Sequence, residues 1–515
     1  MCGILAIYCK NRVEDMKTVK KAQEMLSNRG PDCSHFSTEP HVLGFRRLAI
    51  VEPNEKAMQP FQKNGITVLC NGEIYNHKKL EYTYNLQCES GSDCECILYL
   101  YRKFGFDHMI QILSGDFAIA VIDGDDMYFG RDRIGVRPLF YGCTVDGNMA
   151  VASYARALND YCSHVNQVPP GWGHYNKHTD NINFFEYSYP DYTVNGNSVY
   201  KLVRTILTNA VEARLMSDRP IGCLLSGGLD SSLIASILCR LMGGKNVRTY
   251  SIGMEGSLDL HHARKVSEYL GTNHTEIIFT ANEGFEAIPN VIRDLESYDI
   301  TTIRASVGMW LLSKWIAKHT QDTVLMSGEG ADELFCGYLY FHYAPTPKEL
   351  GVESKRLVKN LYLYDVLRAD RCVSSHGLEL RVPFLDRSLV DLCLAIQPEL
   401  KMPKDGMEKH LLRTAFQESG YLPDSVLWRR KDGMSDGISG SGKRWYEHIQ
   451  DFVEPLITDD EWVNSGLPSK EATYYRKIYD EMFPTYQPKY EYWMPQWVKH
   501  DGDPSGRILE VFEEK

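Results

Sequence analysis

Two cysteine patterns are missing from this 515-residue sequence. Its 14 cysteines include no CxxC pair. Cys94 and Cys96 form a CxC, but no second Cys or His pair follows at zinc-finger spacing, which disfavours a structural zinc site. A long chain whose cysteines follow no spacing pattern is typical of a reducing, intracellular compartment. We therefore expect reduced thiols and a cytoplasmic protein.

Long apolar runs and an excess of basic residues are also missing. No run approaches the ~18 apolar residues that a membrane-spanning helix needs, and the apolar stretch at residues 4–8 is too short for a secretory signal. The formal net charge is −12, whereas nucleic-acid surfaces usually carry a basic face. We expect neither a membrane nor a nucleic-acid partner. At ~100–200 residues per domain, the length allows two to four domains.

The first part of the chain is predicted to be rich in strands. The pattern of apolar residues predicts strands at residues 3–8, 42–51, 66–71, 116–123, 127–130 and 148–153. It predicts helices at residues 15–27 and 93–104. Runs of strands with segregated helices predict an α+β fold with antiparallel sheets. Residues 185–197 are rich in Tyr, Pro, Asp, Asn and Gly, and we interpret them as a linker. A first domain is thus expected at residues 2–185 and a second at 198–515.

From about residue 198 the pattern changes to alternating helices and strands. The predicted strands are 220–225, 247–252, 274–279 and 323–326, and the predicted helices are 201–214, 231–241, 258–270 and 331–335. Such alternation predicts a doubly wound α/β fold, in which a parallel sheet has helices on both faces. The chain beyond about residue 338 is predicted to be mainly helical.

The string SGGLDSS at residues 226–232 is a candidate phosphate loop. It lies between a predicted strand and a predicted helix, where glycines allow close backbone approach and helix N–H groups face an anion. Asp230 adds a carboxylate suited to Mg²⁺. The GxxxxGK[ST] pattern is absent, so this is not a Walker A loop. On the glycines alone, a serine-capped turn is an equal alternative.

The whole SGGLDSS string is more specific. After a strand, it resembles the pyrophosphate loop of the N-type ATP pyrophosphatases, which adenylylate a substrate and release pyrophosphate. The resemblance implies ATP and Mg²⁺ as cofactors. It also implies contacts to pyrophosphate and Mg²⁺ from Ser226, Gly227, Gly228, Asp230 and Ser231.

Cys2 is a candidate nucleophile at the N-terminus. If Met1 is removed, the thiol and a free α-amino group belong to one residue. An α-amine, with a reference pKa of about 7.7–8.0, can act as a base near neutrality. N-terminal threonine hydrolases use the same arrangement. For Cys2 alone, a small residue that merely permits removal of Met1 is the favoured interpretation.

Other strings accompany Cys2: NRGPD (28–32), RLAIV (47–51), NGEIYN (71–76), SGSDCE (90–95) and GRDRIGVRPL (130–139). Together they resemble the class II glutamine amidotransferase domain, an αββα sandwich with an N-terminal cysteine nucleophile. The resemblance implies that Arg47 binds the glutamine α-carboxylate and that Glu73 and Asp93 hold the α-amino group. The implied glutamine-binding residues are Arg47, Leu48, Ala49, Ile50, Val51, Asn71, Gly72, Glu73 and Asp93. Without the resemblance, Asp93 is better interpreted as a helix N-cap.

A class II glutaminase followed by SGGLDSS resembles the glutamine-hydrolysing asparagine synthetases, and the eukaryotic type more closely. Further strings extend the resemblance: YSIGM (250–254), YDITTIRAS (298–306), SGEGADELFCGY (327–338), GLELRVPFLD (377–386), MEKHLLR (407–413) and WRRKDGMSDG (428–437). The resemblance implies synthesis of L-asparagine from L-aspartate, ATP and glutamine through β-aspartyl-AMP. Ammonia would pass between two sites, and a homodimer is suggested.

The same resemblance assigns roles in both sites. It implies that Cys2, Asn71, Gly72 and Glu329 are catalytic, with Asn71 and Gly72 forming the oxyanion hole. The implied ATP contacts are Leu225, Ser226, Gly227, Gly228, Asp230, Ser231, Ile252, Gly253, Ser327 and Gly328. Aspartate and the adenylate are expected near Glu329, Asp332, Arg304 and Lys431, with Asp230 and Asp332 as metal ligands. For Arg304 and Lys431, a solvated surface charge is the alternative.

Three positions depart from the family pattern. Asn28 replaces the histidine of HRGPD, Tyr154 replaces the glutamate of an SExK segment, and Asp432 replaces the glutamate of WRxKE. The change at Tyr154 leaves the detailed interface between the domains open. None of the three removes an expected catalytic group.

Two other functions remain as alternatives. One is a related amidotransferase that adenylylates a different carboxylate, which the retained strings disfavour. The other is a catalytically silent regulator, which the intact Cys2, Asn71, Asp230 and Glu329 disfavour.

Overall fold

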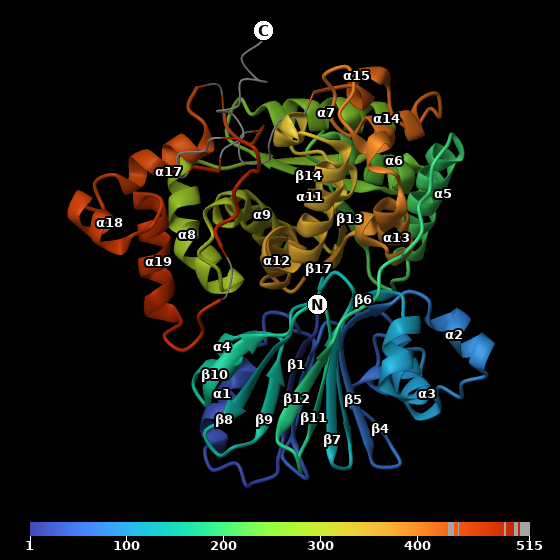
Figure 1. Ribbon diagram of the computed structural model, residues 1–515, viewed down its shortest axis with the longest axis vertical. Helices are drawn as coiled ribbons and strands as arrows, with labels where there is room; N and C mark the ends of the chain where they lie inside the picture. The colour runs from blue at the N-terminus through green and yellow to red at the C-terminus, as the bar shows by residue number, and fades with distance from the viewer. Residues whose placement is uncertain (431–436, 441, 489–490, 499–502, 505–515) are drawn as a thin grey trace.

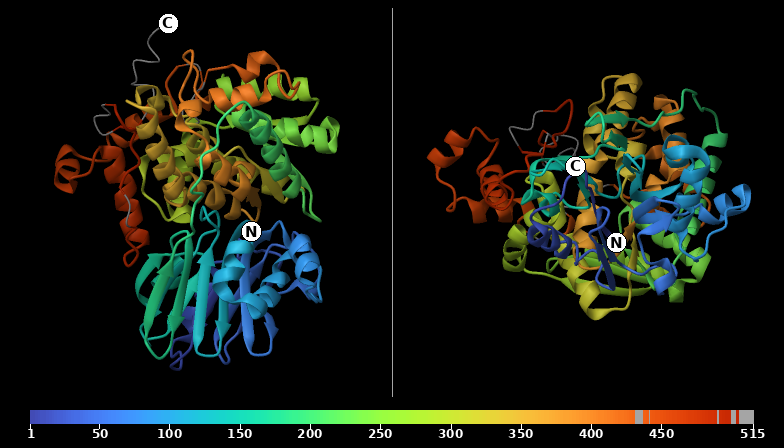
Figure 2. Two further views of the ribbon diagram at one scale, coloured as in Figure 1. Left: turned by 45° about the vertical axis from the view of Figure 1, so that its right-hand side comes forward. Right: turned by 90° about the horizontal axis from the view of Figure 1, so that it is seen from below.

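The chain folds into two parts, one above the other in Figure 1. The computed structural model describes residues 1–430, 437–440, 442–488, 491–498 and 503–504. Strands β1–β12 build the first part, and β13–β17 with most of the helices build the second. The N-terminus lies where the two parts meet, and the left view of Figure 2 shows the same junction from another side.

The first part contains two six-stranded antiparallel sheets. One sheet has the order β10-β8-β9-β1-β3-β2, and its strands are β1 (Gly3–Tyr8), β2 (Cys33–Ser37), β3 (Val42–Arg47), β8 (Phe140–Thr144), β9 (Met149–Ala152) and β10 (Cys162–Gln167). The other has the order β12-β11-β7-β6-β5-β4, and its strands are β4 (Phe61–Lys63), β5 (Ile66–Ile74), β6 (Gly115–Asp123), β7 (Asp126–Arg131), β11 (Gly171–Asn176) and β12 (Asn181–Phe185).

Side-chain alternation along the strands explains why the sheets stack. On β1, Ile4 and Ala6 point into the cluster between the sheets, whereas Leu5 and Ile7 join the cluster on the opposite face. Helices α1 (Met16–Glu24) and α4 (Arg156–Asn159) lie on that opposite face. Helices α2 (His77–Tyr84) and α3 (Cys96–Ile112) cover the other sheet. The αββα sandwich expected from the resemblance is confirmed.

Two predicted boundaries in the first part are wrong. The strand predicted at 42–51 ends at Arg47, because the Arg47 guanidinium binds carbonyl groups of the following loop and turns the chain away from the sheet. The helix predicted from residue 93 begins at Cys96, after a short 3-10 turn at Asp93–Glu95. It continues to Ile112 across a kink at Gly105, whose φ is 74°.

The second part is a five-stranded parallel sheet with the order β15-β14-β13-β16-β17. Its strands are β13 (Ile221–Leu224), β14 (Arg248–Gly253), β15 (Asn273–Ile278), β16 (Val324–Met326) and β17 (Glu379–Arg381). The doubly wound α/β prediction is confirmed. The sequence missed β17, a three-residue strand that pairs Val324 with Glu379 inside a region predicted to be helical.

Helices surround this sheet and extend the chain beyond it. They are α5 (Ser198–Ala213), α6 (Leu229–Met242), α7 (Leu258–Leu270), α8 (Ala281–Leu295), α9 (Ile300–His319), α10 (Ala331–Phe335), α11 (Pro347–Asn360), α12 (Asp365–Ser374), α13 (Arg387–Ala395), α14 (His410–Phe416), α15 (Asp424–Leu427), α17 (Trp445–Val453), α18 (Asp459–Ser465) and α19 (Lys470–Met482). In Figure 1, α12 and β17 lie beside the junction with the first part.

The junction contains buried ion pairs between the two parts. Arg214 lies 3.3 Å from Asp116, and Arg381 lies 3.5 Å from Glu73. The Met1 amine donates to the carbonyl oxygen of Leu378 at 3.2 Å. These contacts hold the N-terminus of the chain directly against β17.

The structure accounts for Tyr154 at this junction. The Tyr154 ring is fully buried, and the Arg156 guanidinium lies 4.0 Å from its centroid. Glu296 accepts hydrogen bonds from the backbone N–H groups of Ala155 and Arg156 and from Arg371 at 2.7 Å. Glu296 therefore supplies the carboxylate that this segment lacks. Of the other departures, Asn28 is exposed and Asp432 lies outside the described residues.

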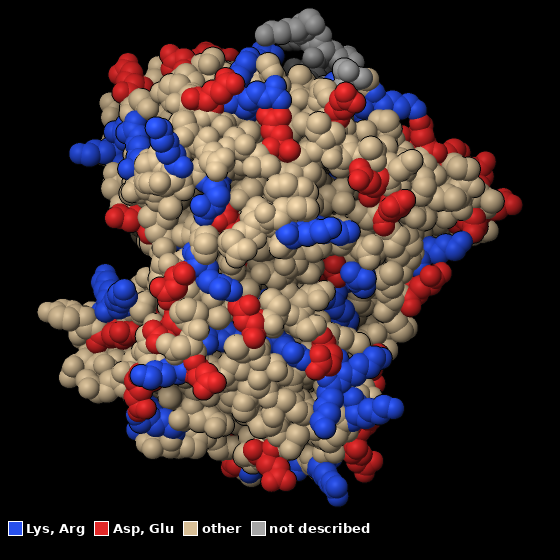
Figure 3. Space-filling model, turned by 180° about the vertical axis from the view of Figure 1, so that it is seen from behind, with Lys and Arg blue, Asp and Glu red and all other residues tan. Residues whose placement is uncertain are grey.

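The helices and the surface charges bear on membrane and nucleic-acid partners. Within the described ranges, no helix is both long enough and apolar enough to cross a membrane. Basic and acidic side chains are interspersed on the face shown in Figure 3. That face therefore presents charges of both signs side by side.

Candidate functional site

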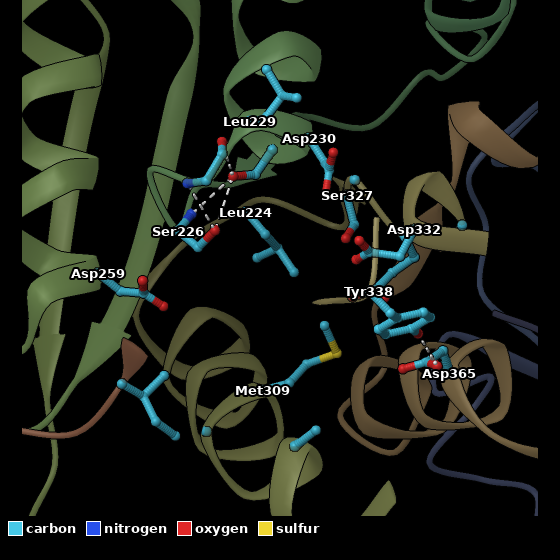
Figure 4. A pocket seen from close by; sticks show the side chains of 18 of the residues that line it. Leu224, Ser226, Leu229, Asp230, Asp259, Met309, Ser327, Asp332, Tyr338 and Asp365 are labelled. Atoms are coloured by element: carbon cyan, nitrogen blue, oxygen red, sulfur yellow. Dashed lines mark hydrogen bonds between the residues drawn. The ribbon is translucent and has the colours of Figure 1, made fainter. Parts of the chain in front are cut away.

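A cavity of about 300 Å³ lies at the carboxyl ends of β13, β14 and β16 (Figure 4). Ligands of parallel α/β sheets usually bind at this edge. Here β13 leads through the SGGLDSS string into α6, whose N-cap is Gly228. The first N–H groups of α6, aided by the helix dipole, suit the binding of an anion.

Backbone geometry explains the glycine and serine residues of this loop. Gly227 has a φ of +74°, and a Cβ atom there would lie 2.4 Å from the backbone nitrogen of Ala263 on α7. The Ser226 and Ser231 hydroxyl groups are 3.0 Å apart, and Ser226 accepts from the N–H of Gly228. Only glycine fits at residue 227, and the serines fix the loop ahead of α6.

Most of the predicted nucleotide residues come together around this cavity. Those that line it are Leu225, Ser226, Gly228, Asp230, Ser231, Ile252, Ser327, Gly328, Glu329, Asp332 and Arg304. Two predicted residues do not line it: Gly227 packs against α7, and Gly253 packs against Ser257. Lys431 lies outside the described residues.

Lys409 joins the two predicted metal ligands. Its Nζ atom lies 2.5 Å from Oδ2 of Asp230 and 2.7 Å from Oδ1 of Asp332. Burial disfavours the charge on Lys409, but the two carboxylates outweigh it and raise the pKa of the lysine. Lys409 belongs to the string MEKHLLR, whose spacing predicts no role for it, because only the fold brings this lysine to the phosphate loop.

The two carboxylates fit Mg²⁺ on a polyphosphate. No group of three or more His, Cys, Asp or Glu side chains among the described residues could hold a metal ion. Mg²⁺ is usually held by one or two carboxylates together with substrate phosphates. In this structure both carboxylates bind the Lys409 ammonium group, and their role as metal ligands stays a prediction.

Glu329 lines the same cavity and is paired with Arg368. The Arg368 Nη2 atom lies 2.8 Å from Oε2 of Glu329 and 2.8 Å from Oδ1 of Asp365. Burial raises the pKa of Glu329, and Arg368 partly opposes that rise. Arg368 thus holds this carboxylate in place in the cavity that the phosphate loop also lines, and the catalytic role of Glu329 stays a prediction.

Arg304 is buried and engaged by two carboxylates. Its Nε atom lies 2.8 Å from Glu471, and its Nη1 atom lies 3.1 Å from Asp503. Only 3% of Arg304 is exposed, so the surface-charge alternative is wrong for this residue. Its contact with substrate stays a prediction.

The second candidate site surrounds Cys2 at the junction. The Cys2 Sγ atom lies 3.8 Å from the carbonyl oxygen of Leu48. Asn71 is fully buried, and within the described part of the chain neither its amide nitrogen nor its amide oxygen has a hydrogen-bond partner. A buried amide without a partner is costly, which suits a donor reserved for a developing oxyanion. At Gly72, a Cβ atom would lie 2.1 Å from the Asp116 carbonyl oxygen.

Two buried carboxylates accompany these groups. Asp93 accepts from the N–H of Ile74 at 2.6 Å, and Ser92, not Asp93, caps the following turn. The N-cap alternative for Asp93 is therefore wrong. Burial raises the pKa of Asp93 and, together with nearby Glu379, the pKa of Glu73. A substrate ammonium group would supply the positive charge that these carboxylates favour.

The predicted glutamine segment contacts Cys2 through the carbonyl oxygen of Leu48. Arg47 donates to the carbonyl oxygens of Glu52 and Asn54, each at 2.6 Å. Leu48 and Ile50 are buried against Val324 of β16. Arg47 shapes the loop in this structure, and its binding of a carboxylate stays a prediction.

With Met1 in place, Cys2 is poorly suited to attack. Burial of its thiol raises the pKa of Cys2 to about 11, so the thiol is protonated near neutrality. Burial also lowers the pKa of the Met1 amine to about 5. While Met1 is present, the free α-amine belongs to Met1, and Cys2 has no α-amine that could act as a base for its own thiol.

We predict that a chain that keeps Met1 hydrolyses glutamine at least ~10²-fold more slowly than the processed chain, since it lacks the positioned base. Mass spectrometry of the intact protein measures processing, and a glutamate assay measures hydrolysis. Ammonia-dependent activity of the unprocessed chain serves as the control for folding. Equal glutamine hydrolysis by both forms would contradict the role of the Cys2 amine.

Comparisons with known proteins agree with this division. Residues 1–211 match the glutamine amidotransferase domain family, and residues 202–354 and 345–501 match the asparagine synthase family. The fold and its two sites thus define a glutamine amidotransferase joined to an ATP-dependent synthetase. The glutamine-hydrolysing asparagine synthetases of Rattus norvegicus and Homo sapiens are 42% and 41% identical to this chain, each over 99% of this chain and 98% of the relative. The chain belongs to the family of glutamine-hydrolysing asparagine synthetases.

Proposed function

We propose that this enzyme makes L-asparagine from L-aspartate, with glutamine as the nitrogen donor and ATP as the activating substrate. The products besides asparagine are glutamate, AMP and pyrophosphate. The main support is that one chain holds a phosphate loop and Glu329 in one cavity, and Cys2 with the buried Asn71 amide in its first part.

The first half-reaction is hydrolysis of glutamine at Cys2. The thiolate attacks the side-chain amide carbon, while the Asn71 amide and the Gly72 N–H stabilise the oxyanion. The α-amino group of Cys2, free once Met1 is removed, takes the thiol proton and returns it to the leaving nitrogen. Collapse then releases ammonia and leaves a thioester, which water converts to glutamate. Glu73 and Asp93 hold the ammonium group of the substrate, and Arg47 holds its carboxylate.

The second half-reaction activates aspartate. A carboxylate is a poor electrophile, so its oxygen first attacks the α-phosphate of ATP and displaces pyrophosphate. Ammonia then attacks the acyl carbon of β-aspartyl-AMP, and AMP leaves. Glu329 accepts the proton that ammonia must lose, and its raised pKa suits that task.

Charge neutralisation on the departing pyrophosphate falls to Lys409 and to Mg²⁺. The carboxylates of Asp230 and Asp332 would hold Mg²⁺, which would neutralise charge on the phosphates. We further propose that the enzyme acts in the cytoplasm and associates as a homodimer. Light scattering of the purified protein tests the association.

Pyrophosphate release tests the proposed function. We expect release from MgATP to depend on aspartate and to fall to background when EDTA removes the metal. Glutamate and β-alanine serve as matched carboxylate controls, and neither should support release. Release that another carboxylate supports better than aspartate would favour the alternative of a related amidotransferase with a different acceptor.

A further inference from the structure

Helix α12 contacts both active sites through residues that lie two positions apart. Arg368 faces the nucleotide cavity and pairs with Glu329. Asp370 is buried at the junction with the first part of the chain. A single helix from the synthetase part therefore reaches toward the glutaminase site as well as its own.

The Arg29 side chain links Asp370 to the nucleophile. The Arg29 Nη1 atom donates to Oδ2 of Asp370 at 2.8 Å and to Oγ of Ser374 at 2.9 Å. The Arg29 Nε atom donates to the main-chain carbonyl of Cys2, also at 2.8 Å. Among the described residues, the hydrogen bonds of Arg29 thus go to α12 and to the backbone of the nucleophile, and its guanidinium also lies 5.1 Å from the centroid of the Tyr154 ring.

Electrostatics make this contact a strong one. Arg137 of the first part also donates to Asp370, at 3.1 Å. Burial disfavours the charge on Asp370, but Arg29 and Arg137 outweigh it and lower its pKa to about 2. Buried, charge-assisted hydrogen bonds of this kind fix geometry more tightly than neutral ones.

On the other face of α12, Arg368 binds the carboxylate of Glu329 directly. Arg368 is buried, and its guanidinium bonds both oxygens of Glu329, at 3.3 Å and 2.8 Å. Because helices are rigid, a displacement of Arg368 would also displace Asp370, which lies less than one turn away. Packed elements with two arrangements are the physical carriers of coupling between sites.

We propose that Asp370 is a positioning residue of the glutaminase site and that α12 couples this site to Glu329. Asp370 orients Arg29, and Arg29 orients the backbone of Cys2. Formation of the adenylate next to Glu329 changes the interaction between Glu329 and Arg368. The resulting displacement of α12 moves Asp370 and Arg29, and with them the backbone of Cys2. This inference rests on the proposed function, because it assumes that Cys2 and Glu329 carry the two half-reactions.

The test is Asp370→Asn, which keeps the size of the side chain and removes its charge. We expect kcat for glutamine hydrolysis to fall by ~10- to ~100-fold, since small misplacements of a catalytic group have effects of this size. KM for glutamine should change less than about twofold, because the proposed binding groups lie on other elements. A loss of structure alone would not produce this split between kcat and KM. Ser374→Ala should shift kcat in the same direction by a smaller factor.

The matched control is Glu296→Gln, which removes a different buried carboxylate at the same junction. Glu296 lies at the end of α8 and accepts a hydrogen bond from Arg371 of α12. Its kcat for glutamine hydrolysis should stay near that of the wild type, and ammonia-dependent synthesis should persist in every variant. Equal kcat in Asp370→Asn and wild type, or equal losses in Asp370→Asn and Glu296→Gln, would overturn the positioning role.

A second arm measures the coupling itself. MgATP with aspartate should change kcat for glutamine hydrolysis in the wild type, and this response should disappear in Asp370→Asn. No response in the wild type, or the same response in both proteins, would overturn the coupling. Absence of glutamine hydrolysis or synthesis in the wild type would instead contradict the proposed function.

Discussion

Replacing Cys2 with alanine should lower glutamine hydrolysis by at least ~10³-fold, because loss of a covalent nucleophile removes the whole thioester route. Ammonia-dependent synthesis should remain within about twofold of the wild type, since Glu329 and the phosphate loop lie in a separate cavity. Its rate should increase with pH as more of the added ammonium becomes NH₃. Glutamate and asparagine assays with glutamine or ammonium chloride, over a pH series, measure these effects.

Cys33→Ala is the matched control for this variant, because Cys33 is an exposed free thiol in the same part of the chain. It should hydrolyse glutamine at the wild-type rate. Continued glutamine-dependent synthesis by Cys2→Ala would contradict the assignment of the nucleophile. Loss of ammonia-dependent synthesis in a folded Cys2→Ala protein would contradict the separation of the two sites.

Replacing Glu329 with alanine should lower asparagine synthesis by ~10²- to ~10⁴-fold, the range that general acid–base groups supply. The variant should still fold, because Arg368 retains its partner Asp365 at 2.8 Å. It should also bind ATP, since the loop at residues 226–232 is unchanged. We expect little aspartate-dependent exchange of label between ATP and pyrophosphate, which measures formation of the adenylate, because Glu329 lines the cavity in which that intermediate would form.

Glu329→Gln separates proton transfer from packing. Glutamine at this position keeps the volume of the side chain and can still accept from Arg368, but it cannot take a proton. We expect a loss of synthesis close to that of Glu329→Ala. Near-normal synthesis by Glu329→Gln would remove proton transfer from the role of this residue, and near-normal exchange by Glu329→Ala would exclude it from activation.

Local strings in the sequence predicted much of both sites. The loop SGGLDSS and the segment NGE each occupy consecutive positions, so their residue types and spacing carry the geometry of a turn or a strand end. The alternation of helices and strands after residue 198 likewise predicted the parallel sheet. Such features depend on neighbours in the chain and can be interpreted before the fold is known.

Long-range partners could not be predicted in this way. Lys409 reaches Asp230 across 179 positions, and Arg29 reaches Asp370 across 341 positions. No periodicity or spacing rule links residues so far apart. The short strand β17 was missed for a related reason, because three residues give too little pattern and its pairing depends on β16.

Substitutions at the junction illustrate the same limit. From residues 153–156 alone, which read SYAR where the family has SExK, Tyr154 looked like the loss of a carboxylate. In the fold, Glu296 comes from the end of α8 and binds the backbone of that segment. The sequence showed the departure, and only the packing of the two parts showed how it is compensated.

The central claim is that glutamine nitrogen passes within this protein to activated aspartate. The most direct test supplies amide-¹⁵N-glutamine, aspartate and MgATP together with an excess of unlabelled ammonium, and measures the mass of the asparagine formed. We predict ¹⁵N in most of the asparagine made by the wild type and unlabelled asparagine alone from Cys2→Ala. Label diluted to the composition of the bulk ammonium, or an amide product of another carboxylate in place of asparagine, would contradict the account.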